Sequence, residues 1–221
     1  MSYGERSAAT TVSVRGVYSD IRLNPISGYP AVAYVDAGAL GLKFSYWNGS
    51  KWIVEFIAGG ASTEFTFVKF AFLTTGVPIV VWSNGATLLR MSSRSAALST
   101  ESSSWSTPVA IDSFTGGVLR AIEIESNPND EVAVSYVTHS ATTPKARVVF
   151  CTSGCADASN YNAMIAAQNV TGGNIGANNH SMGLAWCYTG TDYYPAVAFG
   201  GAANSHVGIC RQANIANCMT S

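Results

Sequence analysis

The chain is poor in charged residues. Only 11% of its 221 residues are Asp, Glu, Lys or Arg, and the formal net charge is −1. Nucleic-acid binding depends on clustered Lys and Arg, so we expect no nucleic-acid partner. A membrane-spanning helix needs about 18 or more consecutive apolar residues, and because no such run occurs we expect no membrane insertion. Residues 1–6 lack the apolar centre of a secretory signal, so we expect a signal that was removed or lies outside this sequence.

The sequence also lacks the common motifs of metal and enzyme sites. It contains no H-x-H or H-E-x-x-H spacing, so we predict no metal site and no cofactor. It contains no G-x-S-x-G motif and no Cys–His arrangement. Acidic residues are present, but none recurs in a motif that fixes the pair of carboxylates a glycoside hydrolase needs. We therefore assign no catalytic residue and favour binding over catalysis.

One six-residue pattern occurs four times. It reads YPAVAY at 29–34, VPIVVW at 77–82, EVAVSY at 131–136 and YPAVAF at 194–199. Equivalent positions in successive copies are 48, 54 and 63 residues apart. A period of this size indicates one supersecondary unit copied several times, and such arrays most often provide binding surfaces.

Each copy is predicted to form an antiparallel four-stranded sheet. The expected strands are 20–25, 29–36, 42–47 and 52–57, then 67–73, 78–82, 88–92 and 105–111, then 119–125, 132–137, 146–151 and 161–167, and last 182–188, 195–199 and 207–210. Asn48-Gly49 between two β-rich runs is a strong hairpin signal. The fourth repeat lacks a fourth strand, and the β-branched residues 8–14 have the length to supply it.

The first repeat resembles the repeats of secreted bacterial β-propellers. Those read G-x-P-x-I-x-Y-x-D and then L-x-Y-x-x-W-N-G-x-x-W, and here residues 28–34 are GYPAVAY and residues 42–52 are LKFSYWNGSKW. The resemblance implies four-stranded blades around an axis and a role in ligand recognition or adhesion, such as the recognition tip of a larger surface adhesin or fibre. The sialidase-type S-x-D-x-G-x-x-W box is absent.

We therefore predict an all-β fold, a single β-propeller domain over residues 1–221. Its repeats are approximately 19–58, 66–112, 117–168 and 181–221, and residues 8–14 close the last of four blades and so close the ring. Two alternatives remain open, namely part of a larger propeller and an incomplete ring that another subunit completes.

Four of the five cysteines form two close pairs. Cys151 with Cys155 and Cys210 with Cys218 follow the third strands of successive repeats, and we predict a disulfide in each pair. Disulfides indicate an oxidising compartment, so we expect a secreted or cell-surface protein. Cys187 lies in an apolar strand and is expected to be an inert buried thiol.

Loops at one end of the blades contain all three histidines. Trp82 and Trp186 are aromatic candidates because a sugar face stacks on an indole while amide side chains bind its hydroxyls. The candidate ligand-binding residues are Trp82, Asn84, His139, Asn179, His180, Trp186 and His206. Two other interpretations remain open. These residues are polar only because polar residues are common in loops, or the three imidazoles form an open metal site.

Basic residues recur at one place in the third strand of three repeats. Lys43, Arg90 and Arg147 occupy it, and Val207 is expected to break the series in the fourth. We interpret these side chains as outward-pointing stems that cover apolar surface rather than as an anion site.

The favoured function is an extracellular lectin-like module that binds carbohydrate or cell-surface glycan without catalysis, and that can form a homo-oligomer. One alternative is a glycan-active hydrolase or lyase that uses His139, His180 and His206. The other is a structural module that binds protein through a broad apolar patch.

Overall fold

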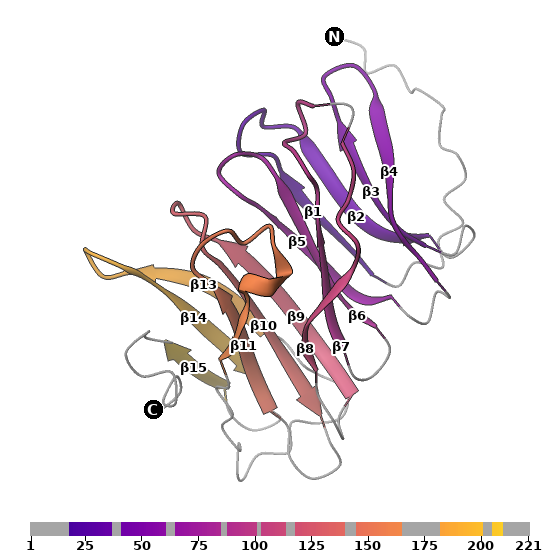
Figure 1. The fold of residues 1–221 in the computed structure, drawn as a ribbon. Helices are drawn as coiled ribbons and strands as arrows, with labels where there is room; N and C mark the ends of the chain where they lie inside the picture. The colour runs from indigo at the N-terminus through magenta and orange to yellow at the C-terminus, as the bar shows by residue number, and fades with distance from the viewer. Residues whose placement is uncertain are drawn as a thin grey trace.

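The fold is all-β and consists of four antiparallel sheets (Figure 1). The computed structural model describes residues 18–36, 41–60, 65–84, 88–100, 103–113, 118–139, 145–164, 182–200 and 205–209. Within these ranges the single helical element is the short 3₁₀ helix η2 (Ala158–Asn160). None of the described segments forms a helix long and apolar enough to cross a membrane.

Consecutive strands pair in each sheet, as the repeat predicts. The first sheet contains β1 (Ser19–Leu23), β2 (Pro30–Asp36), β3 (Gly41–Trp47) and β4 (Trp52–Gly59). The second contains β5 (Thr66–Phe72), β6 (Pro78–Asn84), β7 (Leu88–Ser93) and β8 (Val109–Ser113). The third contains β9 (Val118–Ser126), β10 (Val132–His139), β11 (Lys145–Cys151) and β12 (Asn162–Met164). The fourth contains β13 (Met182–Tyr188), β14 (Tyr193–Gly200) and β15 (Ser205–Ile209).

The outer strand of the second sheet differs from the prediction, and that of the third sheet is described only in part. The outer strand expected at 105–111 is β8, which begins at Val109, and Trp105 forms only an isolated bridge with Arg94. The strand expected at 161–167 is observed as β12, and residues 165–167 lie outside the described ranges. The difference in the second sheet lies in the outermost strand, which has only one neighbouring strand and whose limits depend on loop contacts.

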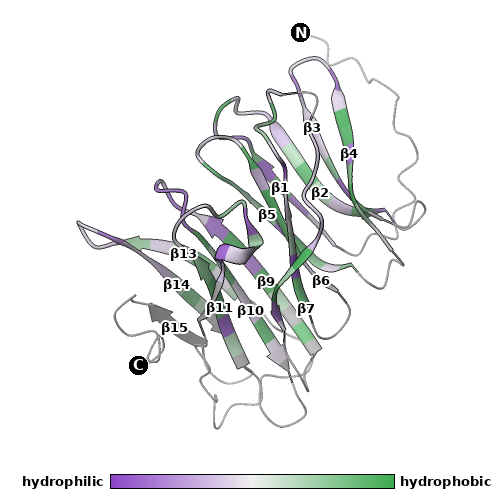
Figure 2. Cartoon of the chain, viewed as in Figure 1, coloured by the Kyte–Doolittle hydropathy of each residue, from purple (hydrophilic) through white to green (hydrophobic). Residues whose placement is uncertain are grey.

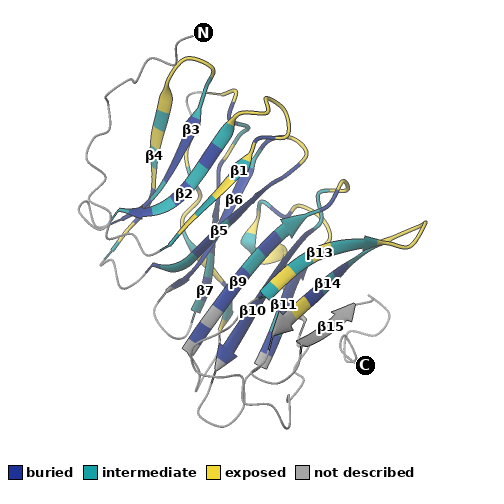
Figure 3. Ribbon diagram, turned by 180° about the vertical axis from the view of Figure 1, so that it is seen from behind, coloured by how far each residue is buried: buried dark blue, intermediate teal, exposed yellow. Residues whose placement is uncertain are grey.

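The sheets stack face to face in a row, with their first strands β1, β5, β9 and β13 side by side (Figure 3). Successive side chains of a strand point to opposite faces of its sheet. Apolar side chains occupy both faces of the second strands, so each of these strands can pack against a neighbouring sheet on either side. Val80 and Trp82 of β6 pack against the first sheet, whereas Ile79 and Val81 pack in the cluster shared with the third. Hydrophobic side chains therefore fill each space between neighbouring sheets.

The two ends of the row are far apart. The first and fourth sheets lie at opposite ends in both views (Figures 1 and 3). A closed ring is thus not seen among the described residues, and residues 8–14, the expected closing strand, lie outside them. The four-bladed ring stays a prediction.

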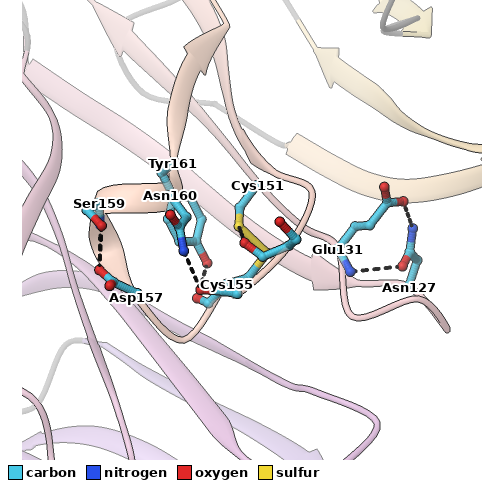
Figure 4. The surroundings of a disulfide bond; sticks show 10 residues. Asn127, Glu131, Cys151, Cys155, Asp157, Ser159, Asn160 and Tyr161 are labelled. Carbon is cyan, nitrogen blue, oxygen red and sulfur yellow. Dashed lines mark hydrogen bonds between the residues drawn. A yellow bond between two sulfur atoms is a disulfide. The ribbon is translucent and has the colours of Figure 1, made fainter.

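One of the two predicted disulfides is confirmed. Cys151 and Cys155 are bonded, with their Cα atoms 5.7 Å apart (Figure 4). Tyr161 Oη donates to the carbonyl of Cys155 at 3.0 Å, and Asn160 Nδ2 donates to the carbonyl of Gly154 at 3.0 Å. Cys210 and Cys218 lie outside the described residues. The thiol of Cys187 is free and half-buried.

Candidate functional site

A cleft of about 330 Å³ opens between the first and second sheets, at the edge where the β1–β2 and β3–β4 turns lie. Three aromatic residues, two asparagines and several residues with hydroxyl groups line it. The lining residues are Asn24, Ile26, Ser27, Tyr29, Tyr46, Trp47, Asn48, Thr75, Ala97, Leu98 and Ser99. No charged side chain is among these described residues. The cleft is therefore suited to a neutral ligand that has both apolar and hydrogen-bonding surface.

The β1–β2 turn forms one side of the cleft and is ordered by Asn24. This residue is 5% exposed, and its Oδ1 accepts a hydrogen bond from the backbone N–H of Ile26 at 2.9 Å. Its own backbone N–H donates to the carbonyl of Tyr29 at 2.8 Å. An asparagine side chain that closes a turn on its own backbone in this way fixes the loop without tertiary contacts.

The β3–β4 turn places Trp47 and Asn48 beside Tyr29. Asn48 Oδ1 accepts from the backbone N–H of Ser50 at 3.0 Å and of Lys51 at 2.9 Å. Gly49 has φ +99°, and a Cβ added there would lie 3.3 Å from the Tyr29 ring. Glycine at this position therefore permits both the turn and the close approach of the tyrosine.

The β5–β6 turn of the second sheet reaches the same place. Gly76 has φ +79°, and a Cβ added there would lie 3.1 Å from Cγ1 of Ile26 and 3.4 Å from Oδ1 of Asn24. A larger residue would push the turn, with Thr75, away from the first sheet. This glycine therefore sets the width of the cleft.

Residues 95–100 form the opposite side of the cleft, and Arg94 holds them in place. The guanidinium of Arg94 is fully buried. It donates to the carbonyls of Ala96 at 2.9 Å, Ala97 at 2.5 Å and Thr100 at 2.7 Å. One side chain thus satisfies three loop carbonyls and fixes the position of Leu98 and Ser99.

An ion pair anchors Arg94 to the first sheet. Its Nη2 lies 2.8 Å from Oε1 of Glu55 on β4, and Trp105 Nε1 donates to Oε2 of Glu55 at 2.9 Å. The Arg94 guanidinium also lies 5.5 Å from the centre of the Tyr46 ring, within the range of a cation–π contact. The two sides of the cleft are therefore joined beneath it by a buried charge pair.

A separate cluster of charged residues lies on the first strands of three sheets. Arg22 Nη1 lies 2.6 Å from Glu125, and Lys69 Nζ lies 3.1 Å from Glu123 and 3.7 Å from Asp20. Two cations thus face three carboxylates. The sequence did not predict this cluster, because its members come from different repeats and no motif links them.

The pKa values of two members of this cluster differ from their ordinary values. Burial raises the pKa of Glu123, and the charge of Lys69 only partly offsets the increase. Burial alone would lower the pKa of Arg22, but its hydrogen bond and attraction to Glu125 raise it overall. The ion pairs satisfy the charges, so we assign the cluster to the joining of the first strands.

An aromatic–basic pair recurs across the second and third strands of every sheet. The register places Tyr34 opposite Lys43, Trp82 opposite Arg90, Tyr136 opposite Arg147 and Phe199 opposite His206. The expectation that Val207 breaks the series was wrong, because His206 occupies the equivalent position. The connection between the two strands differs in length among the repeats, and this hid the equivalence in the sequence.

In the third sheet this pair binds a carboxylate of the second sheet. Tyr136 Oη donates to Oδ2 of Asp112, and Arg147 Nη1 lies 3.3 Å from the same oxygen. Burial, and then the hydrogen bond to Asp112, raises the pKa of Tyr136. Arg147 therefore takes part in a contact between the second and third sheets, and its role in covering apolar surface stays a prediction.

Of the predicted ligand residues, the structure describes the side chains of the two tryptophans. Trp82 is 1% exposed, packs against Phe65 and presents no edge to solvent. Trp186 packs against Phe150 between the third and fourth sheets, and its Nε1 is buried without a partner among the described residues. Trp82 thus has a packing role, and the selection of the half-buried Trp186 as a ligand-binding residue stays a prediction.

The remaining predicted residues are only partly described. Asn84 ends β6, His139 ends β10 and His206 is the second residue of β15, so all three lie at the same edge of their sheets. The structure does not describe their side chains. Asn179 and His180 lie outside the described ranges. A site that uses this edge stays a prediction.

Comparison with known proteins finds no matching family model and no matching curated protein. One similar solved structure comes from a study of two prolyl endopeptidases and of inter-domain dynamics in their catalysis and specificity. The match has a TM-score of 0.47 and 11% sequence identity, and it covers 87% of this chain and 26% of that chain. A match at this level carries no argument about what this chain does.

Proposed function

We propose that this protein is a carbohydrate-recognition module and that the cleft between the first and second sheets binds the sugar. The observation that carries the proposal is the lining: Tyr29 and Trp47 line the cleft together with Asn24, Asn48 and hydroxyl side chains, and no lining residue that the structure describes is charged. Sugar rings present an apolar face to aromatic side chains and hydroxyl groups to amides. The chemistry is the one predicted from the sequence, but the site is at the opposite edge of the sheets.

The fold that we propose around this site is a propeller-type ring in which each four-stranded sheet is one blade. The stacked row, the shared first-strand position and the repeat resemblance support it. We also propose a secreted or cell-surface setting, which the disulfide between Cys151 and Cys155 supports. A glycan exposed on a cell surface is then the natural ligand, and binding without turnover is the expected activity.

A glycan array probed with non-reduced protein, followed by titration calorimetry on the best ligand, tests the proposal. Trp47 and Trp52 are cross-strand partners whose rings touch, but only Trp47 lines the cleft. We expect Trp47→Ala to weaken binding at least about 5-fold and the matched control Trp52→Ala to change it less than 3-fold, since an aromatic contact is worth about 1 kcal/mol or more. A blank array from folded protein, or equal losses in both variants, would contradict the proposal.

A further inference from the structure

The β3–β4 turn contains an Asn-Gly dipeptide, Asn48-Gly49, and Asn48 lines the cleft. The turn is hydrophilic where it joins the two strands at the edge of the first sheet (Figure 2). Gly49, Ser50 and Lys51 are exposed, so water reaches it. An asparagine followed by glycine places a nucleophile beside an electrophile, because the backbone nitrogen of the glycine can close a succinimide ring on the side-chain carbon Cγ of the asparagine.

Three donors converge on the side-chain carbonyl oxygen of Asn48. Its Oδ1 accepts from the backbone N–H of Ser50 at 3.0 Å, from the Ser50 hydroxyl at 3.0 Å and from the backbone N–H of Lys51 at 2.9 Å. This oxygen gains negative charge when a nucleophile adds to Cγ. Donors fixed around such an oxygen lower the barrier to addition, as in the oxyanion hole of an enzyme.

The nucleophile, the backbone nitrogen of Gly49, is unhindered. Glycine has no Cβ, and Gly49 has φ +99°, a conformation that other residues seldom adopt. Within the described part of the chain, its N–H donates no hydrogen bond. The turn therefore polarises the electrophile of this dipeptide and leaves the nucleophile available.

We propose that Asn48 is a modification site, at which the folded protein converts asparagine to aspartate and isoaspartate without an enzyme. The Gly49 nitrogen bonds to Cγ and gives up its proton, and the bond from Cγ to Nδ2 breaks to release ammonia. Water then adds to either carbonyl carbon of the succinimide, breaks a C–N bond of the ring and leaves a carboxylate. The net reaction consumes one water and releases one ammonium ion, with no oxidant or reductant.

The modification changes the cleft as well as the turn. It introduces a negative charge where no described lining residue is charged. The isoaspartate product also adds a methylene to the main chain between Trp47 and Gly49, and so displaces the indole from its position in the cleft. This consequence rests on the proposed function: sugar affinity should decline as modified protein accumulates.

Peptide mapping by mass spectrometry tests the proposal on the full chain. The tryptic peptide 44–51 contains Asn48 as its single asparagine. After incubation of folded protein in heavy-oxygen water at mildly alkaline pH, this peptide should carry the label and become a substrate for enzymatic methylation of isoaspartate. The rate should equal or exceed that of the same chain unfolded in guanidinium chloride, because only the folded turn holds the three donors in place. An unlabelled peptide, or a slower rate in the folded protein, would overturn the proposal.

Ser50→Ala tests the role of the donors, since it removes one of them and leaves the Asn-Gly dipeptide unchanged. We expect it to slow the reaction about 5-fold in the folded protein, the effect of one ordinary hydrogen bond, and to leave the unfolded rate unchanged. Ser153→Ala, at an exposed serine of the disulfide loop, is the matched control and should change neither rate. An equal effect of Ser50→Ala on both rates would show that the folded turn does not promote the reaction.

Calorimetric titration of fresh and incubated protein tests the consequence for the cleft. The fraction of protein that binds sugar should fall as the modified fraction of peptide 44–51 rises. A constant binding fraction would overturn this consequence. A labelled peptide together with a blank glycan array would contradict the proposed function and leave the modification site established, so the two failures are distinguishable.

Discussion

The guanidinium of Arg94 donates to both carboxylate oxygens of Glu55, from Nη2 to Oε1 at 2.8 Å and from Nε to Oε2 at 3.0 Å. Glu55 belongs to β4 of the first sheet, and Arg94 follows β7 of the second. The same guanidinium holds residues 95–100, which form one side of the cleft. Sheet packing and site geometry therefore depend on one buried side chain.

Replacement of Arg94 should be costly to both stability and binding. Arg94→Met leaves Glu55 without its charge partner and three loop carbonyls without their donor. We expect the free energy of unfolding to fall by about 3–5 kcal/mol, as when one member of a buried pair is removed. Urea denaturation measures this change, and Lys51→Met on the exposed turn is the control. A loss no larger than that of the control would show that the ion pair does not join the sheets.

Trp82 should affect stability without affecting ligand binding. Trp82→Ala removes a large, fully buried side chain between the first and second sheets, and we expect a loss of about 3–5 kcal/mol. The milder Trp82→Phe should retain the fold and the sugar affinity within 2-fold. Calorimetric titration of the phenylalanine variant checks this. A large loss of affinity in a stable Trp82→Phe protein would restore Trp82 as a ligand residue.

The Cys151–Cys155 disulfide should contribute modestly, because it closes a short loop. With a sequence separation of 4, chain entropy predicts a contribution of about 2 kcal/mol. The double variant Cys151→Ala/Cys155→Ala should lose that amount in urea denaturation and keep its sugar affinity. Cys187→Ala is the single-cysteine control. A loss of sugar affinity in a folded double variant would contradict the placement of the site in the first two sheets.

Glu123 should make stability fall as pH rises through the acidic range. Burial raises its pKa above the ordinary value of 4.5, so the folded state binds more protons than the unfolded state between those two pKa values. Relative to Glu123→Gln, the unmodified protein should lose stability as pH increases from about 4.5 through the raised pKa. Urea denaturation of both proteins across that window measures the difference. If the unmodified protein instead gained stability relative to Glu123→Gln as the pH rose, the attraction of Lys69 would outweigh burial in setting the pKa of Glu123.

Local sequence signals predicted most of the fold. The repeated YPAVAY-type pattern marks β2, β6, β10 and β14, and Asn48-Gly49 marks the β3–β4 turn. These signals depend on residues adjacent in sequence. The limits of β8 were misplaced because Trp105, which has strong β propensity, is instead used to bind Glu55.

The cleft could not be predicted in the same way. Asn24 and Ser27 are ordinary turn residues by sequence, and Leu98 lies in a serine-rich loop about 70 residues away. Only the stacking of the first two sheets brings them together. Trp47 offered the one available signal, since its position is aromatic in the first repeat and not in the others.

The most direct test of the central claim is chemical-shift mapping of a bound sugar on isotope-labelled protein. We predict that a glycan selected by array perturbs the backbone amides of residues 24–29, 47–48 and 97–99, which surround the cleft. Perturbations that instead cluster at His139 and His206, or the absence of any perturbation at saturating sugar, would contradict carbohydrate recognition at this site.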